Sequence, residues 1–386
     1  MHPIVEAMSV HTVEITINTN KMSLQHIYNL CEKDYKLYRK IDEKHNRIIY
    51  KSTKNNFIPG VNSIILMWYY DEYGYIFSQV EIVFNLNTIL PGAEKSDPFL
   101  TIIPSELIPE AMIRVWEFVK KLNIYNRNAM ITRIDFSINL EFNSLNEADM
   151  FIYLCRKAKW PYCLKDIVYY DEISKREKAF KDCILKACLQ YEIALYNKNK
   201  QMKNSNHEYN EDEMRRAETV VRMERRINRS YVACLLNQYS CSEEDLLIKY
   251  FQPVVRSHGE DQLKLIRLVL GTGEFYSYSS FMDMIDRLDF TDYSKSRIKS
   301  MIKSASKHQS FYWLYSESSP YNKYQIRAVK NGLEKRHISH LIIPDKFNIP
   351  MMGNPFTEYE PDAEKYIYTW NESVRRELQE NKLSII

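Results

Sequence analysis

The chain has 386 residues, and its 53 Lys and Arg nearly balance its 50 Asp and Glu, giving a formal net charge of +3. Only 8 residues are glycine, against a usual share of roughly 7%. The phosphate-binding strings G-x-G-x-x-G and G-x-x-x-x-G-K-[ST] are both absent, which argues against nicotinamide oxidoreductases and nucleotide-driven motors. The chain also lacks a membrane-length apolar stretch and a signal-peptide pattern, and its 7 cysteines are scattered, so we expect a cytoplasmic protein with reduced thiols.

Strand-like and helix-like segments alternate through the first part of the chain. Residues His11–Asn18 alternate polar and apolar side chains with period two, which predicts a strand. Further strands are expected at 63–69, 74–86, 129–142, 166–170, 182–198 and 219–228. Helices are expected at 23–31, 104–122 and 145–158, and the polar segment 199–216 is expected to be an exposed loop or a short helix. This order predicts an α+β fold, with a mostly antiparallel sheet and helices packed on one face.

After Arg229 the pattern becomes helical. Helices are expected at 230–236, 243–250, 262–270, 279–288 and 292–307. We therefore divide the chain into a sheet-based domain, residues 1–229, and a mainly helical domain, residues 230–386.

The helix pair at 279–307 has the pattern of a helix-turn-helix, whose second helix would enter the major groove of DNA. Basic side chains line the expected exposed side of that second helix, and they would contact DNA phosphates: Lys295, Arg297, Lys299 and Lys303. A basic amphipathic helix on a solvated surface explains the same pattern equally well.

Two of the expected strands carry charged residues on one face. Arg133, Asp135, Ser137 and Asn139 alternate with apolar residues, so they share a face that suits a metal or phosphate site. The alternative is the solvated face of a half-exposed strand.

In the strand at 219–228, Glu224 lies between Arg222 and Arg226, which would keep its carboxyl group ionised. It is a candidate metal ligand or acid–base group, or else part of a surface salt bridge of little energetic value. These two arginines and Arg225 are also candidate phosphate contacts.

A third segment contains a candidate nucleophile, Tyr196, two residues before Lys198. A phenol has a pKa of roughly 10 and needs a nearby cation or metal to ionise. The alternative is a half-buried strand tyrosine without a chemical role, which is the usual state of a tyrosine in a chain that has 29 of them.

In order, Arg133-Ile-Asp135, Tyr196-Asn-Lys198 and Arg222-Met-Glu224 resemble the motifs of rolling-circle replication initiators and relaxases of plasmids, phages and integrative elements. The resemblance covers roughly residues 10–230. It implies a nicking domain that binds origin DNA, cuts one strand and remains joined to the 5′ phosphate through a tyrosine. Asp135 and Glu224 would hold Mg²⁺ or Mn²⁺, while Lys198 and Arg222 would neutralise phosphate charge.

The nucleophile stays open, because Tyr191 and Tyr231 lie near enough in the sequence to compete with Tyr196. The chain also departs from the family pattern. The segment Cys183–Cys188 lacks the glycine that many members carry before the tyrosine strand, and the His-hydrophobe-His pair of related nickases is absent.

Three functions are therefore compared. The first is a nicking initiator acting on origin DNA that is single-stranded at the nick, with a host helicase and a second copy of the chain as possible partners and no membrane. The second is a non-catalytic DNA-binding replication or regulatory protein with the same fold. The third is an unrelated α+β protein that binds protein.

Overall fold

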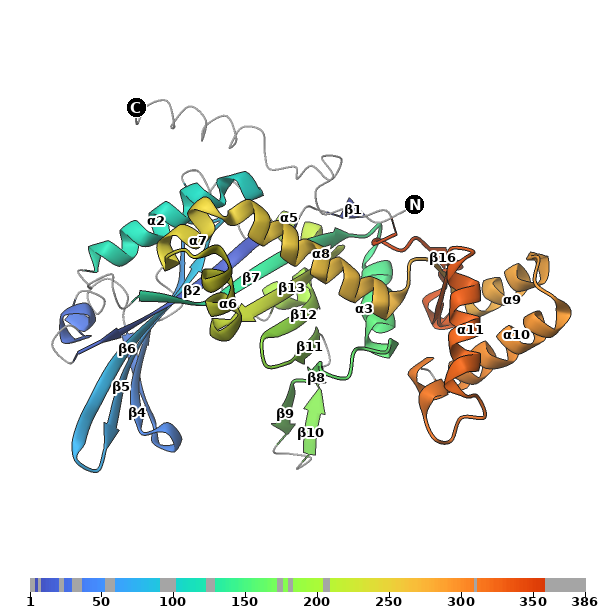
Figure 1. Ribbon diagram of the computed structural model, residues 1–386, viewed down its shortest axis with the longest axis horizontal. Helices are drawn as coiled ribbons and strands as arrows, with labels where there is room; N and C mark the ends of the chain where they lie inside the picture. Colours follow the sequence, from blue (N-terminus) through green and yellow to red (C-terminus); the bar gives the residue numbers. More distant parts are fainter. Residues whose placement is uncertain are drawn as a thin grey trace.

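The structure is a computed structural model with a large antiparallel sheet, helices that cover one face of it, and a smaller C-terminal unit (Figure 1). It describes residues 4–5, 8–20, 24–29, 37–52, 60–90, 102–122, 129–171, 176–179, 183–203, 209–308 and 311–357. The predicted α+β class is confirmed.

The large sheet has the strand order β3-β4-β5-β6-β2-β7-β13-β12-β11-β8, and β1 also pairs with β7. All of these pairings are antiparallel. The strands are β1 (Ile4–Val5), β2 (Ser9–Thr19), β3 (Leu37–Asp42), β4 (Arg47–Ser52), β5 (Val61–Asp71), β6 (Gly74–Asn85), β7 (Ala129–Glu141), β8 (Lys165–Asp166), β11 (Cys183–Ala187), β12 (Tyr191–Asn197) and β13 (Val220–Asn228). A separate hairpin pairs β9 (Val168–Asp171) with β10 (Arg176–Ala179).

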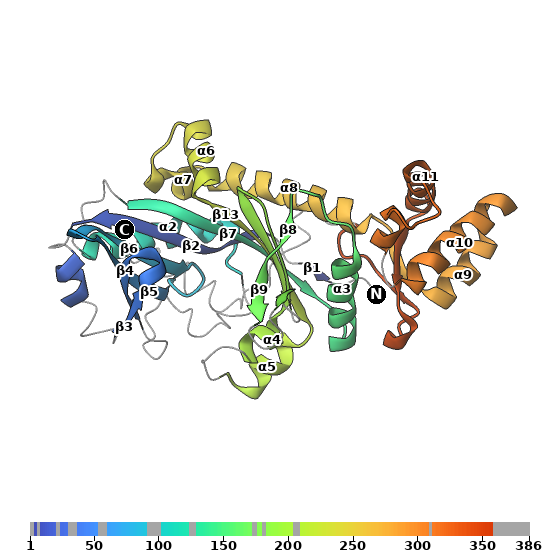
Figure 2. The same cartoon turned by 90° about the horizontal axis from the view of Figure 1, so that it is seen from below.

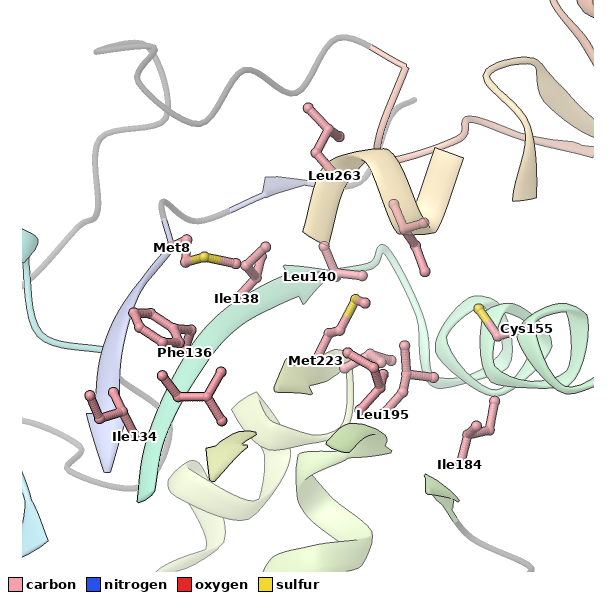
Figure 3. Packing of buried hydrophobic residues seen from close by; sticks show 14 of the residues in the cluster. Met8, Ile134, Phe136, Ile138, Leu140, Cys155, Ile184, Leu195, Met223 and Leu263 are labelled. Atoms are coloured by element: carbon pink, nitrogen blue, oxygen red, sulfur yellow. The ribbon is translucent and has the colours of Figure 1, made fainter. Parts of the chain in front are cut away.

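The central strands bury one apolar face. Ile134, Phe136 and Leu140 alternate along β7, and Met223 continues the same face on β13. Figure 3 shows these side chains packed together, with Leu263 above them. Because side chains alternate along a strand, burying this apolar set turns Asp135 and its neighbours to the opposite face.

Helices cover the apolar face, as predicted (Figures 1 and 2). They are α2 (Ile108–Lys121), α3 (Leu145–Lys157), α6 (Arg229–Tyr239), α7 (Glu243–Lys249) and α8 (Phe251–Leu270). The side chains of Ser144 and Asn228 accept backbone N–H bonds at the starts of α3 and α6, which fixes where these helices begin. Residues 24–29 are also helical, and α4 (Lys198–Lys203) and α5 (Glu211–Ala217) fill the connection between β12 and β13.

Helices α6, α7 and α8 pack on the large sheet and its helices, and α8 ends at Gly271, which has φ 77°. We call the described residues after Gly271 the C-terminal unit. The apolar faces of α6, α7 and α8 contribute to the core that covers the sheet. The domain boundary at residue 229 stays a prediction.

The C-terminal unit contains its own sheet, in the order β15-β14-β16, with β14 and β15 parallel. Its elements are β14 (Glu274–Ser277), α9 (Tyr278–Arg287), α10 (Asp292–Lys307), α11 (Lys323–Glu334), β15 (Ile338–Ile343) and β16 (Met351–Met352). The part of the expected domain beyond residue 357 lies outside the described residues.

Two further differences concern strands. The expected single strand at 182–198 is the hairpin of β11 and β12, which turns at residues 188–190, and Lys198 already belongs to α4. The hairpin of β3 and β4 was not predicted at all. Among the described helices, none is long and apolar enough to cross a membrane.

Candidate functional site

The polar face of β7, β13 and β12 brings the three motifs together. In the strand register, Asp135 is opposite Arg226, Asn139 is opposite Arg222, and Arg222 is opposite Tyr196. Glu224 is between these pairs, opposite Ser137. The sheet therefore gathers on one face groups that are separated by up to about ninety residues in the sequence, as the predicted alternation requires.

Both carboxylates are buried and each is held by an arginine. Asp135 accepts bonds from Arg133, from Nε at 2.9 Å and Nη2 at 3.2 Å. Glu224 accepts bonds from Arg226, from Nη2 at 2.7 Å and Nε at 3.0 Å. Asp135 and Glu224 are 3% and 4% exposed, so these charge-assisted bonds form in a poorly hydrated environment.

The two carboxyl groups have opposite pKa shifts. Burial and the nearby Glu224 charge outweigh the lowering by Arg133 and Arg226, and together they raise the pKa of Asp135 to about 7. Burial alone would raise the pKa of Glu224, but the charges of Arg226 and Arg222 and the hydrogen bond from Tyr196 outweigh it and lower that pKa to about 2. At neutral pH, Glu224 is therefore ionised, while Asp135 is close to its midpoint.

Tyr196 contacts Glu224 directly. Its hydroxyl donates to Glu224 Oε1 at 2.5 Å, and its side chain is only 8% exposed. Burial and the Glu224 charge raise the pKa of the phenol well above its usual value. Lys198 is also buried; its ammonium lies 5.9 Å from the Tyr196 ring centroid and donates to Gln201 at 2.7 Å. The phenol is thus protonated, with a carboxylate as its acceptor.

The structure separates the other two tyrosines from this group. Tyr191 is on the apolar face of β12, and Tyr231 is in the first turn of α6, where its ring is 5.2 Å from that of His258 in α8. The guanidinium of Arg225 is near both rings, at 4.4 Å from Tyr191 and 5.8 Å from Tyr231. Both tyrosines therefore lie on the side of the sheet opposite Asp135 and Glu224.

The structure places Arg225, a predicted DNA contact, on the face of the sheet opposite the two carboxylates. Its side chain is 5% exposed beneath α8 and forms an ion pair with Asp261 at 3.3 Å. Arg222 is fully buried on the polar face, where its Nε donates to Asn139 at 2.8 Å. Among the described residues of this face, Arg133 and Arg226 keep partial exposure, with side chains 34% and 27% exposed, so a phosphate can reach them. Arg133 also forms an ion pair with Glu14 at 3.2 Å.

His11 joins the site and was missed by the sequence reasoning. It occupies a β-bulge of β2, where the register against β7 shifts between Val10 and Thr12. Its Nδ1 is 2.8 Å from the Thr12 hydroxyl, and its buried Nε2 has no hydrogen-bond partner in the described part of the chain. Burial and Arg222 lower the pKa of the imidazole well below its usual value, so His11 is neutral beside Glu224. No local sequence pattern reveals the bulge.

The predicted helix pair exists as α9 and α10, but two of its basic residues are already engaged. Lys299 forms an ion pair with Asp286 of α9 at 2.5 Å, and Lys295 donates to the Asp286 carbonyl at 2.8 Å. Lys303 is exposed, and Arg297 stacks over Tyr293 at 5.1 Å. Lys295 and Lys299 thus hold the two helices together rather than facing only solvent.

The donor groups around Asp135 and Glu224 fit a hard divalent cation by their chemistry, since they comprise two carboxylates and a neutral imidazole nitrogen without a partner among the described residues. Their present arrangement is closed, because arginine or tyrosine donors occupy the carboxylate oxygens. Within the described ranges, no group of three His, Cys, Asp or Glu side chains is arranged to hold a metal.

Comparisons with known proteins add little. No protein-family description and no curated protein matches the chain. Among solved structures, a rolling-circle replication initiator protein from Geobacillus stearothermophilus is similar with 13% identity and a TM-score of 0.29, over 69% of this chain and 85% of that one. The di-domain ARO/CYC protein BexL from the BE-7585A biosynthetic pathway gives 8% identity and a TM-score of 0.16, over 64% and 98%. Both scores are too low to carry an argument about function.

Proposed function

We propose that this chain is a rolling-circle replication initiator, which binds origin DNA and nicks one strand through Tyr196. The observation that carries the proposal is the Tyr196–Glu224 hydrogen bond of 2.5 Å on a sheet face that also contains Asp135 and two reachable arginines. Nucleophile, proton acceptor and phosphate-binding groups thus share one face, in the order of the motifs that resemble the initiator family.

In this proposal the Tyr196 oxygen attacks the scissile phosphorus and its proton passes to Glu224 Oε1. The bond from phosphorus to the 3′ oxygen breaks, the 5′ phosphate stays on Tyr196, and the proton held by Glu224 passes to the leaving 3′ oxygen. Arg133 and Arg226 would bind the phosphate oxygens, on which negative charge accumulates. Under this proposal, the partners of the chain are origin DNA and a host helicase.

A divalent cation, Mg²⁺ or Mn²⁺, belongs to the same proposal. Asp135 and Glu224 would hold it, with His11 as a further donor, and when bound it would polarise the scissile phosphate. Binding of the cation would require the arginines to release carboxylate oxygens. This binding can be measured without any nicking. We expect Mn²⁺ binding, followed by electron paramagnetic resonance, to weaken at least tenfold in Asp135→Asn and in Glu224→Gln, because loss of even an outer-shell partner of a metal ligand typically costs about 10–100-fold.

The decisive experiment is mass spectrometry of the covalent adduct, after incubation with single-stranded origin DNA and Mn²⁺. We expect the adduct on Tyr196 and its loss in Tyr196→Phe. Tyr191→Phe and Tyr231→Phe serve as matched controls, and they should retain the adduct because both rings are on the other side of the sheet. An adduct on either control tyrosine would refute the assignment of Tyr196.

One observation favours a second function, a DNA-binding replication or regulatory protein without nicking. Tyr196 is nearly buried, and the carboxylates are closed by their own arginines. If the protein binds its origin tightly while no tyrosine forms an adduct and a supercoiled origin plasmid stays supercoiled, this second function replaces the first.

A further inference from the structure

A cationic groove is present where the large sheet unit meets the C-terminal unit, away from the site described above. It encloses about 680 Å³ between the segment 159–162 after α3, the last turns of α8, and α11. We call it the junction groove. Its six basic residues are Lys159, Lys264, Arg267, Lys323, Arg327 and Lys330, and its one acidic residue is Glu334.

This charge is far from the average of the chain, in which basic and acidic residues nearly balance. Part of it is compensated locally, since Lys330 lies 3.9 Å from Glu334 and Lys264 lies 3.8 Å from Glu260. Lys323 and Arg327 are one turn apart on α11, are exposed, and form no ion pair with the described residues. Burial, together with nearby Lys159, lowers the pKa of Lys330. The groove thus carries uncompensated positive charge that an anion would neutralise.

Aromatic rings alternate with these cations. Tyr315 lines the groove beneath the Lys159 ammonium, which is 3.7 Å from its ring centroid. Tyr162 is at the rim and is 89% exposed, although Trp160, two residues earlier, is buried and donates to the Cys155 carbonyl at 2.8 Å. Trp160 therefore supports the fold. The Tyr162 ring is largely in solvent, and the Lys165 ammonium lies 3.5 Å from its centroid, so a base stacked on this ring would use the face away from Lys165 or displace that ammonium.

A neighbouring hollow of about 410 Å³ continues the same chemistry. It shares Phe311 and His340 with the junction groove, and four lysines line it: Lys157, Lys303, Lys307 and Lys346. His340 is 3% exposed, and its Nδ1 has no hydrogen-bond partner among the described residues. A polar group bound between the two cationic hollows could form a hydrogen bond with this buried nitrogen.

From these features we propose that the junction groove binds single-stranded DNA, with phosphates on Lys323 and Arg327 and a base stacked on Tyr162. Sequence-tolerant binding of single strands combines a positive groove with aromatic stacking platforms. The volume of the groove suits a drug-sized ligand, about the size of a nucleotide. An acidic peptide would use the cations but would leave the exposed ring without a base.

The test is fluorescence anisotropy with a labelled oligothymidylate, in EDTA and in the Tyr196→Phe background, so that no nicking is involved. The choice of DNA as the ligand rests on the proposed function. Binding in the groove does not require catalysis, so the anisotropy measurement still tests the groove if the protein does not nick DNA. The double variant Lys323→Ala/Arg327→Ala should lower the slope of log affinity against log salt by about 1.4, since each phosphate contact contributes roughly 0.7 for single strands.

Tyr162→Ala should weaken binding at least about fivefold, the lower end of the loss of one stacked base. The matched control is Lys120→Ala/Lys121→Ala at the end of α2, where both lysines are exposed and distant from the groove, and it should change neither quantity. These three variants alter exposed side chains, so circular dichroism should show unchanged folding.

Three results would overturn the proposal. One is equal loss in the α2 control. Another is equal loss of duplex and single-strand binding in Tyr162→Ala. The third is competition by poly-glutamate as strong as that by an oligothymidylate of the same charge, which would make the groove a site for acidic protein segments.

Discussion

Glu224→Gln tests the electrostatics of the candidate site. The substitution keeps the shape of the side chain but removes the charge that faces Arg226, Arg222 and His11 in a buried environment. The pKa of Glu224 falls from 4.5 to about 2 on folding, and at 1.36 kcal/mol per pH unit this corresponds to about 3 kcal/mol of stability at neutral pH. Breaking a buried ion pair costs about 3–5 kcal/mol in other proteins.

The assay is urea unfolding followed by tryptophan fluorescence. With a slope of roughly 3 kcal/mol per molar urea, a loss of about 3 kcal/mol lowers the midpoint by about 1 M. Because the folded pKa is depressed, the stabilisation by Glu224 is present above pH 4.5 and is lost as the pH falls through about 2. The wild type should therefore lose stability in that window, and Glu224→Gln should lose less.

The matched control is Glu192→Gln on the neighbouring strand. Glu192 is 46% exposed and lies 3.9 Å from the same Arg226, so its pair should contribute less than about 1 kcal/mol. Equal destabilisation by the two variants, or a Glu224→Gln protein within about 0.5 kcal/mol of wild type at pH 7, would refute the electrostatic account.

Three further predictions follow from the structure. Asp135 has a raised pKa of about 7, so it contributes stability below pH 3.8 that is lost as the pH rises through 7. Asp135→Asn should therefore make the urea midpoint depend less on pH between pH 4 and 8, and an unchanged dependence of the midpoint on pH would contradict the raised pKa of Asp135. If nicking is observed, its rate should rise with pH through about 7, because metal binding requires the ionised carboxylate; a rate that does not change from pH 6 to 8 would exclude Asp135 as a ligand. Gly273→Ala should destabilise the C-terminal unit by more than about 2 kcal/mol, because the new Cβ would lie 2.2 Å from the Ile338 backbone nitrogen. The control is Gly74→Ala, where the new Cβ has open space around it but φ is 115°. A smaller loss of stability for Gly273→Ala than for Gly74→Ala would contradict the steric argument.

The local patterns predicted most elements near the site. Period-two alternation indicated β2, β7 and β13, and it also assigned Asp135 and Glu224 to polar faces of their strands. The same alternation places Tyr191 and Tyr196 on opposite faces of an extended strand, because one has an odd and the other an even residue number. Local patterns could not show that α6 and α8 pack on the large sheet unit, because they are amphipathic helices like those that follow and only packing shows which core they join.

By itself, the sequence determined the fold class and the side chains that share each strand face, because alternation is a property of neighbouring residues. Only the tertiary structure decided which strands are adjacent. It therefore also decided three contacts: Tyr196 meets Glu224, Arg225 is buried against Asp261, and His11 enters the site from a bulge. The junction groove likewise joins residues from 159 to 340. These contacts depend on strand order and on packing between distant segments, which no local periodicity encodes.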